Sequence, residues 1–212
     1  MRLLSVGLAR TMWFMDVNDL NPGGKDIFAH LIPALTDVYN FKTSPQPTDD
    51  FKEGMKFTNG EFVKDDGTVL ALNITVFTDG IFADTFSSSD DSERVLEEAL
   101  SGLPAFGFSY DPSMIRKKAY DSQLHVYCSR RLSTLNPKLA ELAAKLSTEG
   151  QSTFDFSAIE FWPDQTLVFK PPRFSFQKKI GDAFAENRYW SQAPLPTDKH
   201  LQVLNELEEL LS

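Results

Sequence analysis

The fold is decided by the stretch NGEFVKDDGTVLALNITVFTDGIFADTF, residues 59–86. It contains three dipeptides, Asn59-Gly60, Asp66-Gly67 and Asp79-Gly80, that accept the positive φ angles of a tight type I′ turn. The segments between them are rich in β-branched and aromatic residues, which favour strands. The stretch therefore predicts an antiparallel meander of about four strands over residues 55–87.

A helical pattern follows the meander in SSSDDSERVLEEALSG, residues 87–102. Asp90 and Glu93 have the spacing of a capping box, and Gly102 is a typical stop residue. Its predicted buried stripe consists of Val95, Leu96, Ala99 and Leu100. A second helix precedes the meander, and Pro33 within it predicts a kink or an early break near residue 32. The apolar stripe of this helix is Ile27, Leu31, Ala34, Leu35 and Val38.

Two more helices are expected in the second half of the chain. Asn136-Pro137 begins one as cap and first residue, and the last helix starts at about Asp198. The residues predicted to face inward are Leu139, Leu142, Ala143 and Leu146 in the first, and Leu201, Leu204, Leu207 and Leu211 in the second. Further strands are predicted at Trp13–Val17 and over residues 115–130, 154–162 and 166–179, the last broken at Pro171-Pro172. The expected fold is α+β, with a mainly antiparallel sheet and about four helices.

The 212 residues fit a single globular unit, 1–212, or two packed lobes, 1–102 and 115–212, joined by residues 103–114. The net charge of −9 is uneven. Residues 1–110 contain 17 acidic and 8 basic side chains, whereas residues 111–212 contain 13 of each. A negative field repels nucleic acid and anionic membranes and attracts basic partners, although it also serves solubility.

The sequence favours a cytoplasmic protein. No apolar run approaches the roughly 20 residues that span a bilayer. The apolar stretch at the start is interrupted by Arg10 and leads into Asp16, which is unlike a signal peptide. The single cysteine, Cys128, cannot form an internal disulfide, so nothing requires an oxidising compartment.

The side chains with catalytic potential do not form a recognisable reaction centre. Cys128 and His125 are three residues apart in a predicted strand, so they point to opposite faces and cannot act as a pair. The three histidines lack metal-ligand spacing. The carboxylates that could form a metal site are Asp79, Asp84, Glu160 and Asp164. Asp79 is accounted for as a turn residue, so we expect no catalytic residue, metal or cofactor.

The stretch ENRYWSQAPLPTDKH, residues 186–200, combines a Trp, a Tyr, an Arg and a His. Thr197 is a good helix N-cap, and His200 falls in the first turn of the last helix. Every residue type in the stretch has a structural role except Arg188. The sequence therefore predicts an ordered loop that holds the terminal helix in place.

Five segments together resemble the immunity proteins of bacterial polymorphic toxins, in particular immunity protein family 52: residues 16–28, 77–90, 119–127, 154–164 and 186–201. The resemblance spans most of the chain but includes no mechanistic motif. It implies a cytoplasmic, non-enzymatic α+β protein that binds and neutralises a cognate toxin, of nuclease type and delivered by a secretion system such as type VI.

The interface expected for such a partner is acidic, because a nuclease presents a basic groove. The predicted interface residues are Asp84, Asp91, Glu97 and Glu98, with Arg188, Tyr189 and Trp190 as the alternative set. Two other functions remain open: a small carboxylate- or metal-dependent hydrolase, and a phage or assembly protein that forms homo-oligomers through the terminal leucine helix. Neither a nucleic-acid partner nor a membrane partner is expected.

Overall fold

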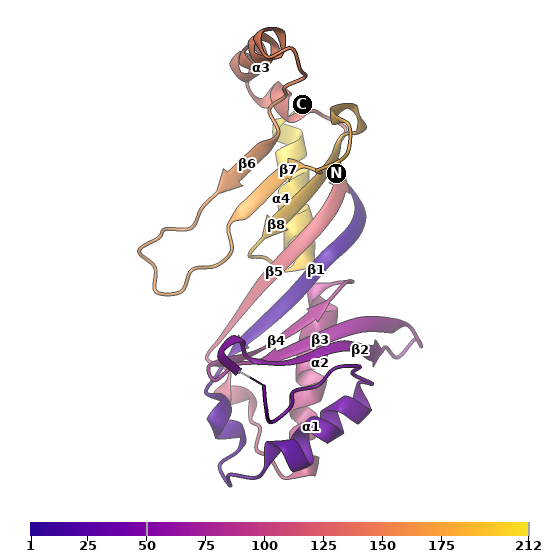
Figure 1. The fold of residues 1–212 in the computed structure, drawn as a ribbon, viewed down its shortest axis with the longest axis vertical. Helices are drawn as coiled ribbons and strands as arrows, with labels where there is room; N and C mark the ends of the chain where they lie inside the picture. The colour runs from indigo at the N-terminus through magenta and orange to yellow at the C-terminus, as the bar shows by residue number, and fades with distance from the viewer. Residues whose placement is uncertain (50, 212) are drawn as a thin grey trace. The chain divides into compact units, whose positions relative to one another are not determined.

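The computed structural model describes residues 1–49 and 51–211, without the side chain of Phe51 (Figure 1). Within these residues it contains eight strands and four α-helices, which confirms the α+β prediction. The elements are β1 Arg2–Phe14, α1 Ile27–Val38, β2 Met55–Val63, β3 Val69–Val76, β4 Gly80–Thr85, α2 Ser89–Gly102, β5 Lys117–Tyr127, α3 Pro137–Glu149, β6 Ala158–Phe161, β7 Phe174–Lys178, β8 Arg188–Ala193 and α4 Thr197–Leu210. The sheet is antiparallel and its strand order is β2-β3-β4-β1-β5-β8-β7-β6.

The chain forms two compact units. The N-terminal unit is Leu8–Tyr120, and the C-terminal unit combines Met1–Gly7 with Asp121–Ser212, so β1 and β5 contribute residues to both. The connector predicted at 103–114 lies inside the N-terminal unit. This unit contains 18 acidic and 10 basic residues, a net charge of −8, whereas the C-terminal unit contains 12 and 11. The charge asymmetry seen in the sequence therefore follows the structural division.

The core of the N-terminal unit lies between one face of its strands and the helices α1 and α2. Trp13, Phe57, Ile74 and Leu96 are almost fully buried in it. The stripe predicted for α2 is confirmed, since Val95, Leu96 and Leu100 are buried and Ala99 packs against them. The N-cap of α2 is Ser88 and not Asp90, which was predicted from its capping-box spacing. The Ser88 side chain accepts a hydrogen bond from the Asp91 backbone N–H.

Helix α1 runs through Pro33 without ending there, so no early break occurs. The Asp26 carboxylate caps its start by accepting from the Phe28 and Ala29 backbone N–H groups. Val38, predicted in the buried stripe, is instead 60% exposed. It is the last residue of α1, and Tyr39, which follows it, is buried in the core instead.

The strand predicted at Trp13–Val17 is wrong in its limits. Strand β1 covers Arg2–Phe14, and Val17–Leu20 forms a short 3₁₀ helix that Asp16 caps by accepting from the Asn18 N–H. The helix-capping side chain of Asp16 ends the extended chain, because its carboxylate offers the backbone an alternative to the strand ladder.

The Asn59-Gly60 dipeptide is not a turn, and this prediction is wrong. Both residues lie inside β2, where the register with β3 shifts between Phe57 and Gly60. Asn59 has a φ of 56°, and its N–H donates to the Asn73 side chain. The positive φ is used for a β-bulge rather than for a hairpin turn. The meander consequently has three strands instead of four.

The other two dipeptides do mark the hairpin turns. Gly67 has a φ of 82° in the turn between β2 and β3, closed by the hydrogen bond from Lys64 N–H to the Thr68 carbonyl. In the turn between β3 and β4, the Phe77 N–H donates to the Gly80 carbonyl. Asp66 in the first turn and Thr78 and Asp79 in the second have no positive φ, so neither turn is of the type I′ that the dipeptides suggested.

The C-terminal unit packs α4 against one face of its strands (Figure 1). Leu124, Val126, Phe176, Tyr189 and Leu204 have no exposed surface in this core. The stretch 186–200, predicted as a loop, contains strand β8, which pairs with both β5 and β7. The loop prediction is wrong because the aromatic residues are strand residues in the sheet and do not pack under a loop. Thr197 is the first residue of α4 and not its cap.

Helix α3 begins as predicted, with the Asn136 side chain accepting from the Lys138 N–H and Pro137 in the first position. Its inward-facing stripe is not confirmed. No residue of α3 is buried, and Leu142 and Leu146 are 52% and 45% exposed. Strand β7 begins at Phe174, after Pro171-Pro172. Residues 166–170, predicted as the first part of this strand, form no strand. No helix among the described residues is both long and apolar enough to cross a membrane.

Candidate functional site

The exposed face of α2 is the best candidate for a partner-binding surface in the N-terminal unit. Burial of Val95, Leu96 and Leu100 turns Glu97 and Glu98 outward, and both are exposed, as predicted. Asp90, seven residues before Glu97, lies on the same side of the helix and is also exposed. No ion pair joins Asp90, Glu97 or Glu98 to a basic side chain in the described part of the chain.

Neighbouring elements extend this acidic surface. Burial, followed by the charge of Glu98, raises the pKa of Tyr39, which follows α1. Burial and the charges of Glu97 and Asp111 raise the pKa of Tyr110. Asp111 is itself exposed. We call Asp90, Glu97, Glu98 and Asp111 the α2 acidic face. Asp90 follows from the helical spacing of α2, whereas Asp111 comes from a loop after α2 and cannot be assigned to this face from the sequence.

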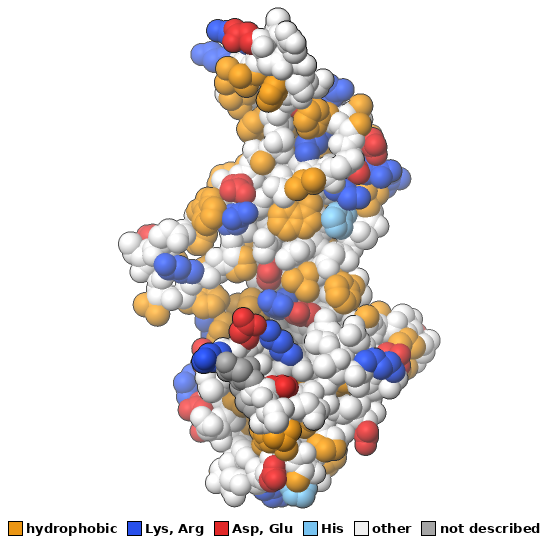
Figure 2. All heavy atoms as spheres, viewed as in Figure 1, with side chains coloured by type: hydrophobic (Ala, Val, Ile, Leu, Met, Phe, Trp, Pro, Cys, Tyr) orange, Lys and Arg blue, Asp and Glu red, His pale blue; other side chains and the backbone are white. Residues whose placement is uncertain are grey.

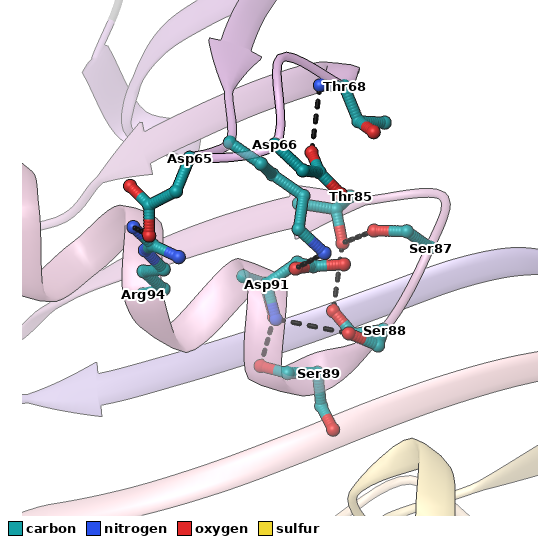
Figure 3. A network of polar contacts seen from close by, with 11 residues as sticks. Asp65, Asp66, Thr68, Thr85, Ser87, Ser88, Ser89, Asp91 and Arg94 are labelled. Carbon is teal, nitrogen blue, oxygen red and sulfur yellow. Dashed lines mark hydrogen bonds and ion pairs between the residues drawn. The ribbon is translucent and has the colours of Figure 1, made fainter.

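Asp91 has a structural role, so the expectation that it is an acid free of structural duty is wrong (Figure 3). Its side chain is 11% exposed, and its carboxylate lies 2.8 Å from the Lys64 ammonium at the end of β2. Burial opposes its ionisation, but hydrogen bonds with Lys64, Ser87 and Ser88 lower the pKa of its carboxyl nonetheless. Asp91 therefore ties the first turn of α2 to the β2–β3 turn. Arg94, one turn further on, donates to Asp65 of the same turn at 2.7 Å.

Asp84 is also occupied within the fold. It lies opposite Arg10 in the register of β4 and β1. The Arg10 guanidinium donates to both of its carboxylate oxygens, from Nε at 2.6 Å and from a terminal nitrogen at 2.8 Å. Two parallel bonds of this kind hold the carboxylate firmly, and its side chain is only 13% exposed. Asp84 is not available as a free interface acid.

The alternative interface residues lie on β8 in the C-terminal unit. Tyr189 has no exposed surface and stacks on Phe176, with ring centroids 4.4 Å apart, so it cannot contact a partner. Trp190 is half-buried opposite His125. Arg188 is exposed and has two carboxylates, Asp182 and Glu186, at 3.7 and 3.5 Å.

The side chains with catalytic potential are dispersed or buried. Cys128 has no exposed surface, and burial raises the pKa of its thiol. Glu160 has Arg173 Nε at 3.1 Å, and Asp164 accepts from the Thr166 N–H and hydroxyl in a turn. No group of three His, Cys, Asp or Glu side chains suited to a metal ion occurs among the residues that the structure describes.

One serine–histidine contact does occur, and no local sequence pattern indicates it. His200 lies between two serines, with Nδ1 2.7 Å from the Ser122 hydroxyl and Nε2 2.8 Å from the Ser191 hydroxyl. All three residues are buried, and burial lowers the pKa of His200 to about 4. The neutral imidazole can donate to one hydroxyl and accept from the other. Because no substrate reaches it, we interpret this contact as the polar anchor of α4 on the sheet.

The N-terminal unit also contains a cavity of about 810 Å³ between α1, α2 and the sheet. Its walls are mainly apolar and include Leu31, Leu35, Phe57, Ile74 and Leu100. Asn18, Asn21, Lys52, Thr78 and Asp79 are the polar side chains that line it. These described side chains do not include a nucleophile beside a base, so the lining lacks the catalytic pair of a hydrolase.

Comparison with known proteins leaves the identity open. No protein-family model matches the chain, and no curated protein gives a significant match.

Proposed function

We propose that this protein is a cytoplasmic immunity protein, which binds a cognate bacterial toxin and blocks it. The observation that carries the proposal is the concentration of negative charge. The N-terminal unit has a net charge of −8, and the α2 acidic face presents Glu97 and Glu98, neither of which forms an ion pair in the described chain.

A basic toxin of the nuclease type is the partner that this surface suits. A nuclease must hold phosphates, so its active-site groove is positively charged. Carboxylates placed opposite such a groove speed the encounter and disfavour partners of the wrong charge. The buried side chains of Val95, Leu96 and Leu100 hold α2 on the core. The backbone that carries the carboxylates is therefore already ordered before a partner binds, which lowers the entropic cost of binding.

Two further features favour binding over catalysis. Cys128 and His200, which have the side chains best suited to nucleophilic and general-base chemistry, are fully buried. Asp84 and Glu160, the carboxylates that a hydrolase could use, are held by Arg10 and Arg173. A reaction centre would require these groups to be accessible and close to one another.

The test is neutralisation of a protein encoded by a neighbouring gene that stops bacterial growth when it is expressed alone. Co-expression of the two proteins in a bacterial host should restore growth, and the purified pair should bind. The variant Glu97→Lys/Glu98→Lys should weaken binding at least tenfold at about 50 mM salt and less at about 500 mM, because screening removes the charge contribution.

A matched control is Glu206→Lys/Glu209→Lys, which reverses two exposed acids on α4. It changes the net charge equally but leaves the α2 acidic face intact, so binding should be unchanged. Growth that is not restored, together with no binding, would refute the function. Binding that both double variants leave intact would retain the function and move the interface away from α2.

A further inference from the structure

The sheet of the C-terminal unit has one face that α4 covers and one that bears polar and aromatic side chains. Leu124, Val126 and Tyr189 point to the covered face. Because side chains alternate along a strand, His125 and Tyr127 of β5 and Arg188 and Trp190 of β8 point to the opposite face. Cross-strand neighbours are Tyr127 with Arg188, and His125 with Trp190.

Three cations lie along one end of this second face. The Lys179 N–H donates to the Arg188 carbonyl at 3.0 Å, which places Lys179 beside Arg188. Arg188 lies opposite Tyr127, and the Arg2 guanidinium is 5.3 Å from the centre of the Tyr127 ring. Lys179, Arg188, Tyr127 and Arg2 thus form one row across the sheet, which we call the cationic row. Figure 2 shows basic side chains gathered near the N-terminus, where β1 begins.

The side chains of the cationic row have N–H donors that remain available for hydrogen bonds. Lys179, the residue after β7, and Arg188 on β8 are like charges held close together, and such neighbours repel each other. The nearby carboxylates are Asp182, 3.7 Å from each of them, and Glu186, 3.5 Å from Arg188. These distances exceed those of a good N–H···O hydrogen bond. The three cations therefore outnumber the two carboxylates, and their donors remain available.

A depression of about 610 Å³ lies over this row. It is lined by Arg2, Lys179, Arg188, His125, Tyr127 and Glu186, among others. His125 Nδ1 is buried and has no hydrogen-bond partner in the described part of the protein. Asp182, one of the two nearby carboxylates, also has a buried oxygen without a hydrogen-bond partner, so unsatisfied atoms do not identify the ligand. The cations, which come from three separate segments and line one depression, are what points to an anionic ligand.

We propose that this depression binds a small oxyanion, namely phosphate or the phosphate group of a monoester. Guanidinium groups donate two parallel bonds to phosphate oxygens, and the lysine adds a point charge. The three cations and two carboxylates leave a local charge of +1, so an anion is favoured, and phosphate suits the site better than a carboxylate ligand because its additional oxygens can accept from donors on separate segments. The site is separate from the α2 acidic face and does not rest on the proposed function.

The experiment is thermal unfolding of the full chain with inorganic phosphate, glycerol 3-phosphate or acetate at equal ionic strength. A ligand that binds only the folded state raises the melting temperature. Both phosphates should do so, whereas acetate should not. Stronger binding of glycerol 3-phosphate would identify an ester as the ligand, and stronger binding of inorganic phosphate would identify the free ion.

The decisive variant is Lys179→Gln/Arg188→Gln. Its phosphate affinity, measured by calorimetry, should fall at least tenfold. Without phosphate it should melt at the same temperature as the parent or higher, because the like-charge neighbours are gone; a merely structural role would lower it. The control Lys138→Gln/Lys145→Gln removes two exposed cations from α3 and should bind phosphate like the parent. No phosphate-specific stabilisation of the parent, or an equal loss of affinity in the control, would overturn the proposal.

Discussion

The Lys64 ammonium lies 2.8 Å from the Asp91 carboxylate, and the same distance separates Lys56 from Glu53. The two ion pairs differ in their surroundings. The Asp91 side chain is 11% exposed and that of Glu53 is 84% exposed. Water therefore screens the second pair, whereas the first is enclosed by the β2–β3 turn and the start of α2.

We expect Asp91→Ala to lower the free energy of unfolding by about 1–2 kcal/mol, since it removes a buried, hydrogen-bonded carboxylate from the first turn of a helix. Glu53→Ala should change it by less than about 0.5 kcal/mol. Urea unfolding of both variants measures the difference. Equal effects would show that enclosure does not strengthen the Asp91 pair.

The stability of the protein should fall as the pH drops below about 6.5, because of His200. Burial lowers the pKa of His200 to about 4, below the ordinary value of 6.5. Above pH 6.5 the folded and the unfolded chain both hold this histidine neutral. Between pH 6.5 and 4 only the unfolded chain takes up the proton, so the free energy of unfolding decreases, in total by about 3 kcal/mol.

Urea unfolding at a series of pH values tests this dependence. In His200→Asn the slope between pH 6.5 and 4 should become shallower, whatever the stability at pH 7. The control His30→Asn changes an exposed histidine and should keep the slope of the parent. A slope that His200→Asn leaves unchanged would assign the pH dependence to other groups.

Gly60 should not tolerate a side chain. A Cβ atom added there would lie 2.4 Å from Cε1 of Phe41, whose ring is buried against Phe57. We expect Gly60→Ala to cost about 2–3 kcal/mol through overpacking. Gly23→Ala meets nothing within 4 Å, so it should be neutral or slightly stabilising. Combining Gly60→Ala with Phe41→Leu should recover part of the loss if the clash is the cause.

Helix α3 should contribute little to stability through its leucines. Leu142→Ala and Leu146→Ala change half-exposed side chains and should each cost less than about 0.5 kcal/mol. Leu204→Ala, at a fully buried position of α4, should cost about 2–5 kcal/mol. Chemical unfolding compares the three. A large loss at Leu142 would mean that a surface covers α3 in solution.

The sequence determined the local elements wherever one physical rule acted alone. The α2 stripe was predictable because Val95, Leu96 and Leu100 repeat at helical spacing, and the start of α3 because Asn136-Pro137 has a single good interpretation as cap and first residue. The same rules indicated that Glu97 and Glu98 face outward. None of these features depends on a partner from a distant part of the chain.

The tertiary structure decided the features that depend on contacts between residues far apart in the sequence. Asn59-Gly60 satisfies a turn and a bulge equally well, and pairing with Asn73 on β3 selects the bulge. Asp84 and Asp91 look like free acids until the register and the turn bring Arg10 and Lys64 to them. The cationic row likewise exists only because β1, β5 and β8 place Arg2, Tyr127 and Arg188 side by side. Sequence periodicity indicates which way a side chain points on its own helix or strand. The charged group or ring that lies beside it on a neighbouring strand is set by strand register, which the local sequence does not encode.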